Sequence, residues 1–365
     1  MAMEEAQVRE LLGSLIDPTT GKDYPAGKAV KSVAVSGDDV TVDIVLGYPA
    51  KSVLETVRLQ VESALKALRG VGRVSVNTSY KIVPHAVQGG VKLIPGVRNI
   101  VAVASGKGGV GKSTVAVNLA LALAAEGASV GLLDADIYGP SVPIIMGVKG
   151  EPKKIEVGGV QKIEPTMAHG VPVMSIGFFL DADQAVIWRG PMLGKALHQL
   201  MGDVHWGELD YLVVDMPPGT GDVQITFSQQ LKVSGALLVA TPQHVALADV
   251  VRAKSMFDKV MIPIVGLIEN MSYFICDGCN KEHDIFSRGG AKQAAERFQI
   301  PFLGEIPITP ALRQGGDEGV PILIQDPNSP VSKSFLDIAG KLAGQLSIAA
   351  ERGNKGQGPT IITTH

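Results

Sequence analysis

Residues 99–125 read NIVAVASGKGGVGKSTVAVNLALALAA. An apolar run comes first, a glycine-rich loop follows it, and an Ala- and Leu-rich stretch without a helix breaker completes the segment. This is the order strand, loop, helix, and the loop matches G-x-x-x-x-G-K-S/T, a pattern that binds nucleotide phosphates in that context. A glycine turn without a ligand is the alternative, and the flanking strand and helix argue against it. The segment therefore predicts a phosphate-binding loop.

In such a loop, backbone N–H groups surround phosphate oxygens and the helix N-terminus adds partial positive charge. We expect Lys112 to reach the β- and γ-phosphates and the hydroxyl of Ser113 to bind Mg²⁺. A second lysine, Lys107, is poorly placed for the same phosphate, so we interpret it as serving the nucleotide of a partner; a solvated loop lysine is the alternative. The residues expected to contact the nucleotide here are Gly106, Lys107, Gly108, Gly109, Val110, Gly111, Lys112, Ser113 and Thr114.

Beyond this loop, short apolar runs alternate with stretches of helical spacing. The runs are IVAVA at 100–104, SVGLL at 129–133, YLVVD at 211–215, GALLVA at 235–240, IVGLI at 264–268 and PFLGEI at 301–306. Such alternation predicts a mostly parallel sheet covered by helices on both faces. We therefore expect an α/β fold of the P-loop NTPase type.

Residues 1–83 have a different pattern. A helix around Val8–Leu15, a strand pair joined by a turn, a second helix and a further strand are predicted in the order α-β-β-α-β. These elements predict a small α+β domain. Residues 84–97 lose periodicity and gather Gly and Pro, which is typical of a linker. The nucleotide-binding domain then occupies residues 98–351, and a polar, flexible tail occupies 352–365.

The composition excludes several classes of function. The chain has 365 residues and a formal net charge of −3, so no global basic field attracts nucleic acid or anionic lipid. The N-terminus is acidic where a signal peptide is basic, and no run approaches the ~20 apolar residues of a membrane span. The 2 cysteines are too few for a disulfide framework, which favours a reducing compartment. We expect a cytoplasmic protein without a nucleic-acid or membrane partner.

Carboxylates follow two of the apolar runs. Asp134 and Asp136 end the run at 129–133, and Asp215 ends YLVVD, which is the Walker B pattern. Ligands of open α/β sheets bind at the carboxyl edge of the strands. We expect Asp136 to orient the attacking water, Asp215 to support Mg²⁺, and Asp134 to support Mg²⁺ or the loop. An Asp turn or helix cap is the alternative for Asp134. With Lys107 and Lys112, Asp136 and Asp215 form the predicted catalytic group.

The cysteines form a C-x-x-C motif, whose spacing lets both thiolates of Cys276 and Cys279 face one metal or cluster edge. Structural zinc and [4Fe–4S] clusters usually take four ligands, so one pair requires a second pair. A twofold dimer supplies it, and Lys107 also favours a dimer. Two alternatives remain: a zinc site completed by His283, and a dithiol redox switch, which lacks a thioredoxin-like context.

Six strings carry a family resemblance: SGKGGVGKST (105–114), DADIYGPSVP (134–143), DMPPGTGD (215–222), TPQHVALADV (241–250), GLIENMSYFIC (266–276) and IPITPALRQGGDEGVP (306–321). Over residues 98–345 the chain resembles the Mrp/ApbC family of iron–sulfur cluster carriers, which are deviant Walker A ATPases. The resemblance implies ATP hydrolysis with Mg²⁺ and a [4Fe–4S] cluster on Cys276 and Cys279, transferred to apoproteins. It also implies that Lys107 crosses a homodimer and that Asn270 contacts the adenine; a turn asparagine is the alternative.

The N-terminal module resembles a small iron–sulfur assembly domain of the SufT type. That domain often carries a cysteine, whereas residues 46–52 here contain none, so we interpret the module as a docking or regulatory piece. For the protein as a whole, the resemblance implies iron–sulfur apoproteins and cluster assembly factors as partners. Two other functions share the loop chemistry: a Min- or Par-type positioning ATPase with a structural zinc site, and an electron-transfer protein like the nitrogenase iron protein. The polar tail and net charge argue against the first, and the close cysteine spacing argues against the second.

Overall fold

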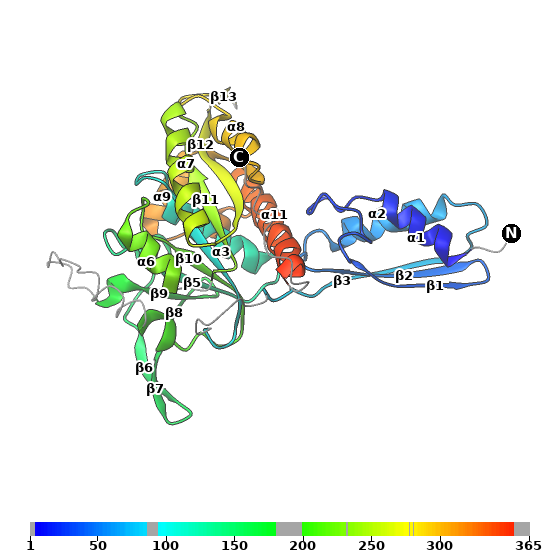
Figure 1. Cartoon of the computed structure of the whole chain (residues 1–365), viewed down its shortest axis with the longest axis horizontal. Coiled ribbons are helices and arrows are strands. Elements are labelled where there is room, and N and C mark those ends of the chain that lie inside the picture. Colours follow the sequence, from blue (N-terminus) through cyan, green and yellow to red (C-terminus); the bar gives the residue numbers. More distant parts are fainter. Residues whose placement is uncertain are drawn as a thin grey trace. The chain divides into compact units, whose positions relative to one another are not determined.

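The computed structural model describes residues 4–85, 94–179, 199–230, 233–276, 278–279 and 281–353. The chain divides into two compact units (Figure 1): Met1–His85 with Ala125–Gly127 and Ala343–His365, and Ala86–Ala124 with Ala128–Leu342. Within the predicted linker, residues 86–93 lie outside the described residues, and so does the predicted tail from residue 354 onward. In the described ranges, no helix has both the length and the apolar character needed to cross a membrane.

The N-terminal unit has the predicted order α-β-β-α-β. Its elements are α1 (Glu5–Ser14), β1 (Val30–Ser36), β2 (Asp39–Leu46), α2 (Leu54–Lys66) and β3 (Val74–Tyr80). The sheet order is β1-β2-β3, with β1 antiparallel to β2 and β2 parallel to β3. Alternate residues of β2, from Val40 to Leu46, are buried, and α2 contributes a buried stripe at Val57, Val61 and Leu65. The core of this unit is therefore formed by every second residue of the strand and by residues three to four positions apart on the helix.

The second unit contains the larger sheet, whose order among the described residues is β13-β12-β11-β4-β10-β5-β9-β8, with β14 also paired to β12. Its strands are β4 (Val97–Ala104), β5 (Val130–Asp134), β8 (Thr166–Ala168), β9 (Val171–Ser175), β10 (Leu209–Asp215), β11 (Gly235–Ala240), β12 (Ile264–Ile275), β13 (Glu282–His283) and β14 (Phe302–Ile308). The pairings are parallel except for β12 with β13 and β8 with β9. A separate hairpin joins β6 (Lys153–Val157) to β7 (Val160–Glu164).

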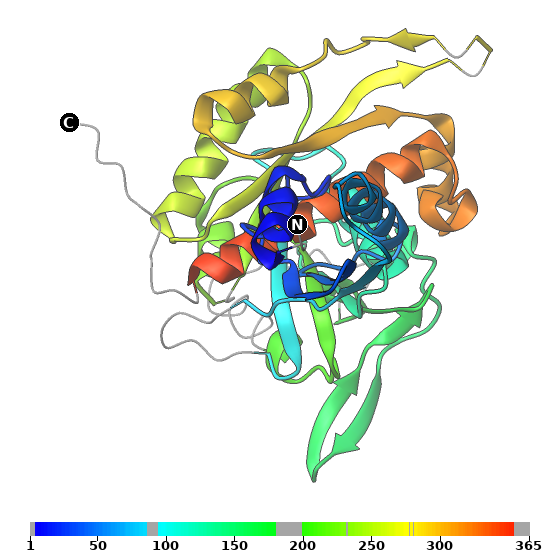
Figure 2. The same ribbon diagram turned by 90° about the vertical axis from the view of Figure 1, so that its right-hand side faces the viewer.

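Helices cover both faces of this sheet, as Figures 1 and 2 show. The helices are α3 (Lys112–Ala125), α4 (Val142–Ile145), α6 (Asp222–Gln230), α7 (His244–Lys259), α8 (Gly290–Phe298), α9 (Pro310–Glu318), α10 (Ile322–Gln325) and α11 (Pro330–Gly353), with a 3₁₀ turn at Ile176–Phe179. Ile100, Ala102 and Ala104 of β4 join apolar residues of α6, α7 and α8 in one cluster. Buried residues follow one another without a break along most of β4, as expected for a strand covered on both sides. The predicted fold class is confirmed.

One strand is longer than its apolar run. The run IVGLI covers residues 264–268, whereas β12 continues to Ile275. Met271 adopts a left-handed φ of 57°, and the register with β14 shifts between Asn270 and Phe274. A β-bulge therefore interrupts the pairing without ending the strand, because Tyr273, Phe274 and Ile275 are strong β-formers. As a result, β12 extends up to the C-x-x-C motif.

Candidate functional site

The phosphate loop lies between β4 and α3 and is closely surrounded. Gly111 has a left-handed φ of 78°, and a Cβ there would lie 2.3 Å from Nδ2 of Asn270. A Cβ on Gly106 would lie 2.4 Å from the carbonyl oxygen of Asp249 on α7. Both positions therefore require glycine, one for its conformation and both for space. The sequence pattern and the fold agree on a loop whose backbone approaches its neighbours closely.

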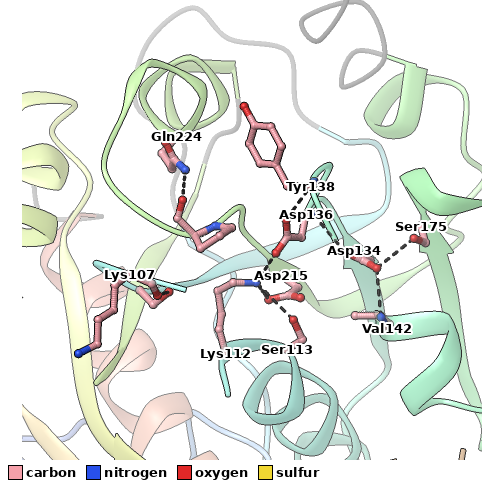
Figure 3. A network of polar contacts seen from close by, with 12 residues as sticks. Lys107, Lys112, Ser113, Asp134, Asp136, Tyr138, Val142, Ser175, Asp215 and Gln224 are labelled. Atoms are coloured by element: carbon pink, nitrogen blue, oxygen red, sulfur yellow. Dashed lines mark hydrogen bonds and ion pairs between the residues drawn. The ribbon is translucent and has the colours of Figure 1, made fainter. Parts of the chain in front are cut away.

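Lys112 is held by two of the predicted carboxylates. Because β10 lies between β4 and β5 in the sheet, the ends of these strands bring Asp215 and Asp136 to the start of α3. The Lys112 Nζ lies 2.5 Å from Oδ1 of Asp215 and 3.4 Å from Oδ2 of Asp136 (Figure 3). Lys112 is 5% exposed and Asp215 is fully buried. Residues far apart in the sequence thus form one ionic cluster.

The second carboxylate oxygen of Asp215, Oδ2, is buried without a hydrogen-bond partner among the described residues. Burial raises the pKa of Asp215, and the Lys112 ammonium opposes that rise. A buried oxygen without a donor is costly unless a cation or water completes it. The hydroxyl of Ser113 lies 3.4 Å from Lys112 Nζ in the same cluster. A hydroxyl, a carboxylate and nucleotide phosphates are hard oxygen ligands, so the donor set fits Mg²⁺.

Asp134 supports the loop that follows β5. Its carboxylate accepts hydrogen bonds from the N–H groups of Asp136 and Val142, both at 3.1 Å, and from the hydroxyl of Ser175 at 3.0 Å. Burial, together with the charge of Asp215, raises the pKa of Asp134 to about 7. These contacts match the Asp-turn alternative, and they place Asp136 toward Lys112. The Mg²⁺ role assigned to Asp134 from the sequence stays a prediction.

Asp134→Asn is expected to flatten the pH dependence of stability in the nucleotide-free protein. The folded pKa lies above the ordinary 3.8, so the contribution of Asp134 to stability falls as pH rises from about 4 to about 7 and is constant above that range. The slope has an upper limit of about 1.4 kcal/mol per pH unit. Thermal unfolding between pH 5 and 8 should show wild type losing Tm relative to the variant as pH rises. A constant Tm difference would contradict the shift, and the exposed Asp317→Asn is the control.

The turn after β10 is braced by a residue that the sequence analysis did not identify. The Nε2 of Gln224, on α6, donates to the carbonyl oxygen of Pro218 (Figure 3). The N–H of Gly219 donates to the carbonyl oxygen of Ser105 in the phosphate loop at 3.0 Å. The turn is therefore tied both to its own helix and to the loop. Such an element is suited to respond to a γ-phosphate.

Lys107 points away from Lys112 (Figure 3). Its Nζ lies 3.5 Å from Oδ2 of Asp249, a residue that is 7% exposed on α7. The carbonyl oxygen of Lys107 accepts a hydrogen bond from the hydroxyl of Ser105 at 2.8 Å. Within one chain, the two lysines of the loop therefore have different partners. The role of Lys107 toward a second copy stays a prediction.

Asn270 lies against the phosphate loop. Its Nδ2 donates to the carbonyl oxygen of Val110 at 2.8 Å, and the residue is 4% exposed. The structure thus brings Asn270 to the nucleotide-binding loop, while its predicted contact with adenine stays a prediction. The neighbouring Glu269 is fully buried and accepts hydrogen bonds from Ser272 and from the N-terminus of α8. The sequence gives no local signal for this role of Glu269, because α8 lies far along the chain.

The two cysteines lie between the antiparallel strands β12 and β13, and we call the described residues 273–276, 278–279 and 281–283 the cysteine hairpin. Cys276 is partly buried and Cys279 is exposed. The N–H of Cys276 donates to the carbonyl oxygen of Lys281 at 3.0 Å and closes the turn. His283 lies opposite Phe274, with ring centroids 6.5 Å apart. Over the described ranges, no three His, Cys, Asp or Glu side chains are grouped to hold a metal, so the zinc site with His283 is not assembled within one chain.

Comparison with known proteins gives two matches to protein families. Residues 96–343 match the ParA family, described as NUBPL iron-transfer P-loop NTPase, and residues 5–76 match the family described as iron-sulfur cluster assembly protein. The first match covers the sheet, the phosphate loop and the cysteine hairpin. The second covers the N-terminal unit up to the middle of β3.

Curated relatives agree over most of the chain. An iron-sulfur cluster carrier protein of Synechocystis is 43% identical over 345 residues, which cover 94% of this chain and 98% of the relative. The protein of the same name from Escherichia coli is 42% identical, covering 93% of this chain and 92% of the relative. The iron-sulfur cluster transfer protein NUBPL of Dictyostelium discoideum is 48% identical over 272 residues, covering 74% of this chain and 84% of that protein.

Solved structures support the same assignment. A nucleotide-binding protein from Archaeoglobus fulgidus in complex with ADP has a TM-score of 0.58 and 37% identity, covering 67% of this chain and 93% of that one. The ATP complex of Cyanothece McdA has a TM-score of 0.50 at 16% identity, covering 70% of this chain and 98% of that one, and shows the fold alone. With the loop, the carboxylates and the cysteine hairpin in place, these matches show that the chain belongs to the ParA-type family of NUBPL iron-transfer P-loop NTPases.

Proposed function

We propose that this protein is an ATP-hydrolysing iron–sulfur cluster carrier. A [4Fe–4S] cluster is its cargo, held by Cys276 and Cys279 from each of two copies and passed to apoproteins. The relatives named as cluster carriers support the cargo, and the C-x-x-C motif supplies half of the usual four thiolates. A cytoplasmic location follows from the need to keep these thiols reduced.

The observation that carries this proposal is the continuity of β12. The middle of the strand supplies Asn270, whose amide is hydrogen-bonded to Val110 of the phosphate loop. Beyond the bulge at Met271, the C-terminal end of the strand leads directly into Cys276. Nucleotide and cargo sites are therefore joined by a single strand, which offers a direct route by which nucleotide occupancy affects the cysteines.

The residues of the phosphate loop support hydrolysis of ATP. Lys112 is placed to bind the β- and γ-phosphates once it leaves Asp215 and Asp136. Ser113 and Asp215 would hold Mg²⁺, which neutralises charge on the phosphates when bound. Asp136 orients the attacking water, and Asp134 fixes the turn that carries Asp136. Phosphoryl transfer depends mainly on positioning and electrostatic stabilisation, so no strong base is needed.

A homodimer completes both sites. Lys107, whose partner within the chain is Asp249, would cross to the phosphates of the second copy and add positive charge there. The same twofold axis brings the second cysteine pair to the cluster. The N-terminal unit, which matches an iron-sulfur cluster assembly family, would dock apoproteins or assembly factors.

Anaerobic reconstitution with iron and sulfide tests the function. We expect about four irons and four sulfides per dimer, co-eluting with a visible absorption band on a sizing column. Zinc should be counted in the same fractions. Zinc alone would contradict the proposal and favour a structural metal site, whereas a cluster on a monomer would contradict the sharing of the cluster by two copies.

A further inference from the structure

The cysteine hairpin has few backbone contacts of its own. Among the described residues, two pairs join β12 to β13, Phe274 with His283 and Ile275 with Glu282. One further bond, from Cys276 to Lys281, closes the turn. β13 is an edge strand of the sheet, and residues 281–288 are all exposed. A ladder of this length is only marginally stable by itself, so side chains must hold the hairpin closed.

Arg288 makes the side-chain contacts that connect this hairpin to the sheet. Its Nη1 donates to Glu282 of β13 at 2.6 Å, while its Nε and Nη2 donate to Glu305 of β14 at 2.9 and 2.7 Å. The guanidinium carbon lies 4.1 Å from the centre of the Tyr273 ring on β12. One side chain therefore touches both strands of the hairpin and the neighbouring strand. Only arginine combines a planar fork of donors with stacking on an aromatic ring.

The backbone that carries Arg288 is itself anchored. Ser287 and Gly289, on either side of it, both have left-handed φ angles, 71° and 85°. The N–H of Gly289 donates to Glu269 at 2.8 Å, and that of Ala291 donates to the second oxygen of Glu269 at 2.7 Å. Because Glu269 is fully buried on β12, these bonds fix the segment that precedes α8. The guanidinium therefore extends from an anchored backbone toward the hairpin.

We infer that Arg288 is a positioning residue for the cysteine pair, and that its contacts set how long the cargo is held. While Arg288 ties Glu282 to Glu305 and Tyr273, β13 stays paired with β12, and the thiols of Cys276 and Cys279 are held ready to bind one cargo. When these contacts open, the thiols separate and the cargo is released. This inference rests on the proposed function only for the identity of the cargo.

The side chains that hold the hairpin are partly exposed, so the strength of their contacts depends on salt. The side chains of Arg288, Glu282 and Glu305 are 34%, 51% and 22% exposed. Ion pairs with this exposure are screened as ionic strength rises. The stacking of Arg288 on Tyr273 is screened less, because it depends on a short-range contact. An acidic or basic surface of an acceptor protein could compete for the same groups.

The first test uses the apoprotein and a trivalent arsenical, phenylarsine oxide, which binds tightly only when it bridges two thiols. Arg288→Ala should weaken arsenical binding about tenfold, because the variant loses two exposed ion pairs and one cation–π contact. Reaction of the same thiols with iodoacetamide, which needs one thiol at a time, should change less than twofold. Arg288→Lys should lie between wild type and Arg288→Ala. Arg313→Ala, which removes an exposed arginine–aspartate pair on α9, is the matched control.

The second test uses loaded protein and follows the loss of the cluster absorption to a chelator. Raising the salt from about 50 to about 500 mM should speed loss from wild type and leave Arg288→Ala unchanged. ATP hydrolysis and Tm should stay at wild-type values in Arg288→Ala and in Arg288→Lys. Equal arsenical affinity in wild type and Arg288→Ala would overturn the inference. Protein that loads no cluster would refute the proposed cargo instead, while the arsenical result would still decide the role of Arg288.

Discussion

Cys276→Ser and Cys279→Ser are each expected to abolish cluster binding while leaving nucleotide affinity near the wild-type value. Serine keeps the size of the side chain but supplies no thiolate, and one remaining cysteine per chain gives a dimer only two of the usual four ligands. Serine alters one atom of a side chain outside the phosphate loop, so the nucleotide affinity of each cluster-free variant should stay close to that of cluster-free wild type. Iron and sulfide content, the visible spectrum and titration with a fluorescent ATP analogue measure the two effects.

Gly278→Ala is the matched control for these variants. Gly278 lies between the cysteines, and a Cβ there would be 3.9 Å from the Cys276 sulfur, an ordinary contact. Gly278 does not adopt a left-handed φ, so the turn does not need a glycine for its conformation. The control should load a full cluster. Equal iron content in a serine variant and in Gly278→Ala would refute the assignment of the cysteines.

Lys112→Ala is expected to lower ATP turnover by about 10²–10³-fold or more, the size of effect seen when one preorganised charge contact is removed. The loss should appear in nucleotide affinity as well, because the ammonium contacts phosphates in the ground state. The variant also leaves Asp215 fully buried without its cation, so Asp215 should take up a proton. Steady-state hydrolysis and calorimetric titration with Mg·ATP separate the two losses.

Lys107→Ala provides the contrast within the same loop. The side chain pairs with Asp249 and points away from Lys112, so binding of nucleotide by the monomer should be nearly unchanged. Turnover in the dimer should fall, because the charge supplied to the partner's phosphates is lost. The deficit should be largest at protein concentrations at which wild type is dimeric. Wild-type turnover in this variant would refute the role of Lys107 across the dimer.

The phosphate loop, the cysteine pair and the strand-end aspartates could be predicted because each is a local pattern. A glycine loop followed by Lys112 requires only its flanking strand and helix to be recognised. The juxtaposition of Asp136 and Asp215 at Lys112 also follows from the sequence, because carboxyl ends of parallel strands share an edge. The exact pairing, with Lys112 between two carboxylates, required the strand order.

The residues that the sequence did not indicate act through contacts that no local pattern encodes. Glu269 caps α8, Asp249 pairs with Lys107, and Gln224 braces a turn that precedes its own helix. Asp249 and Glu269 lie within strings that carry the family resemblance, but that resemblance assigned them no role, and Gln224 lies outside those strings. The extension of β12 was also missed, since a left-handed Met271 inside a strand has no sequence signal of the kind that glycine gives.

The ion pairs of Lys112 make nucleotide binding an exchange reaction. In the structure one ammonium is shared by two carboxylates, Asp136 and Asp215, so the site contains its own competitor for phosphate. Phosphates that capture Lys112 leave these carboxylates without a counter-charge unless a divalent cation enters at the same time. We therefore expect the site to discriminate against metal-free nucleotide. After hydrolysis the same carboxylates recapture the lysine and thereby assist the departure of the product.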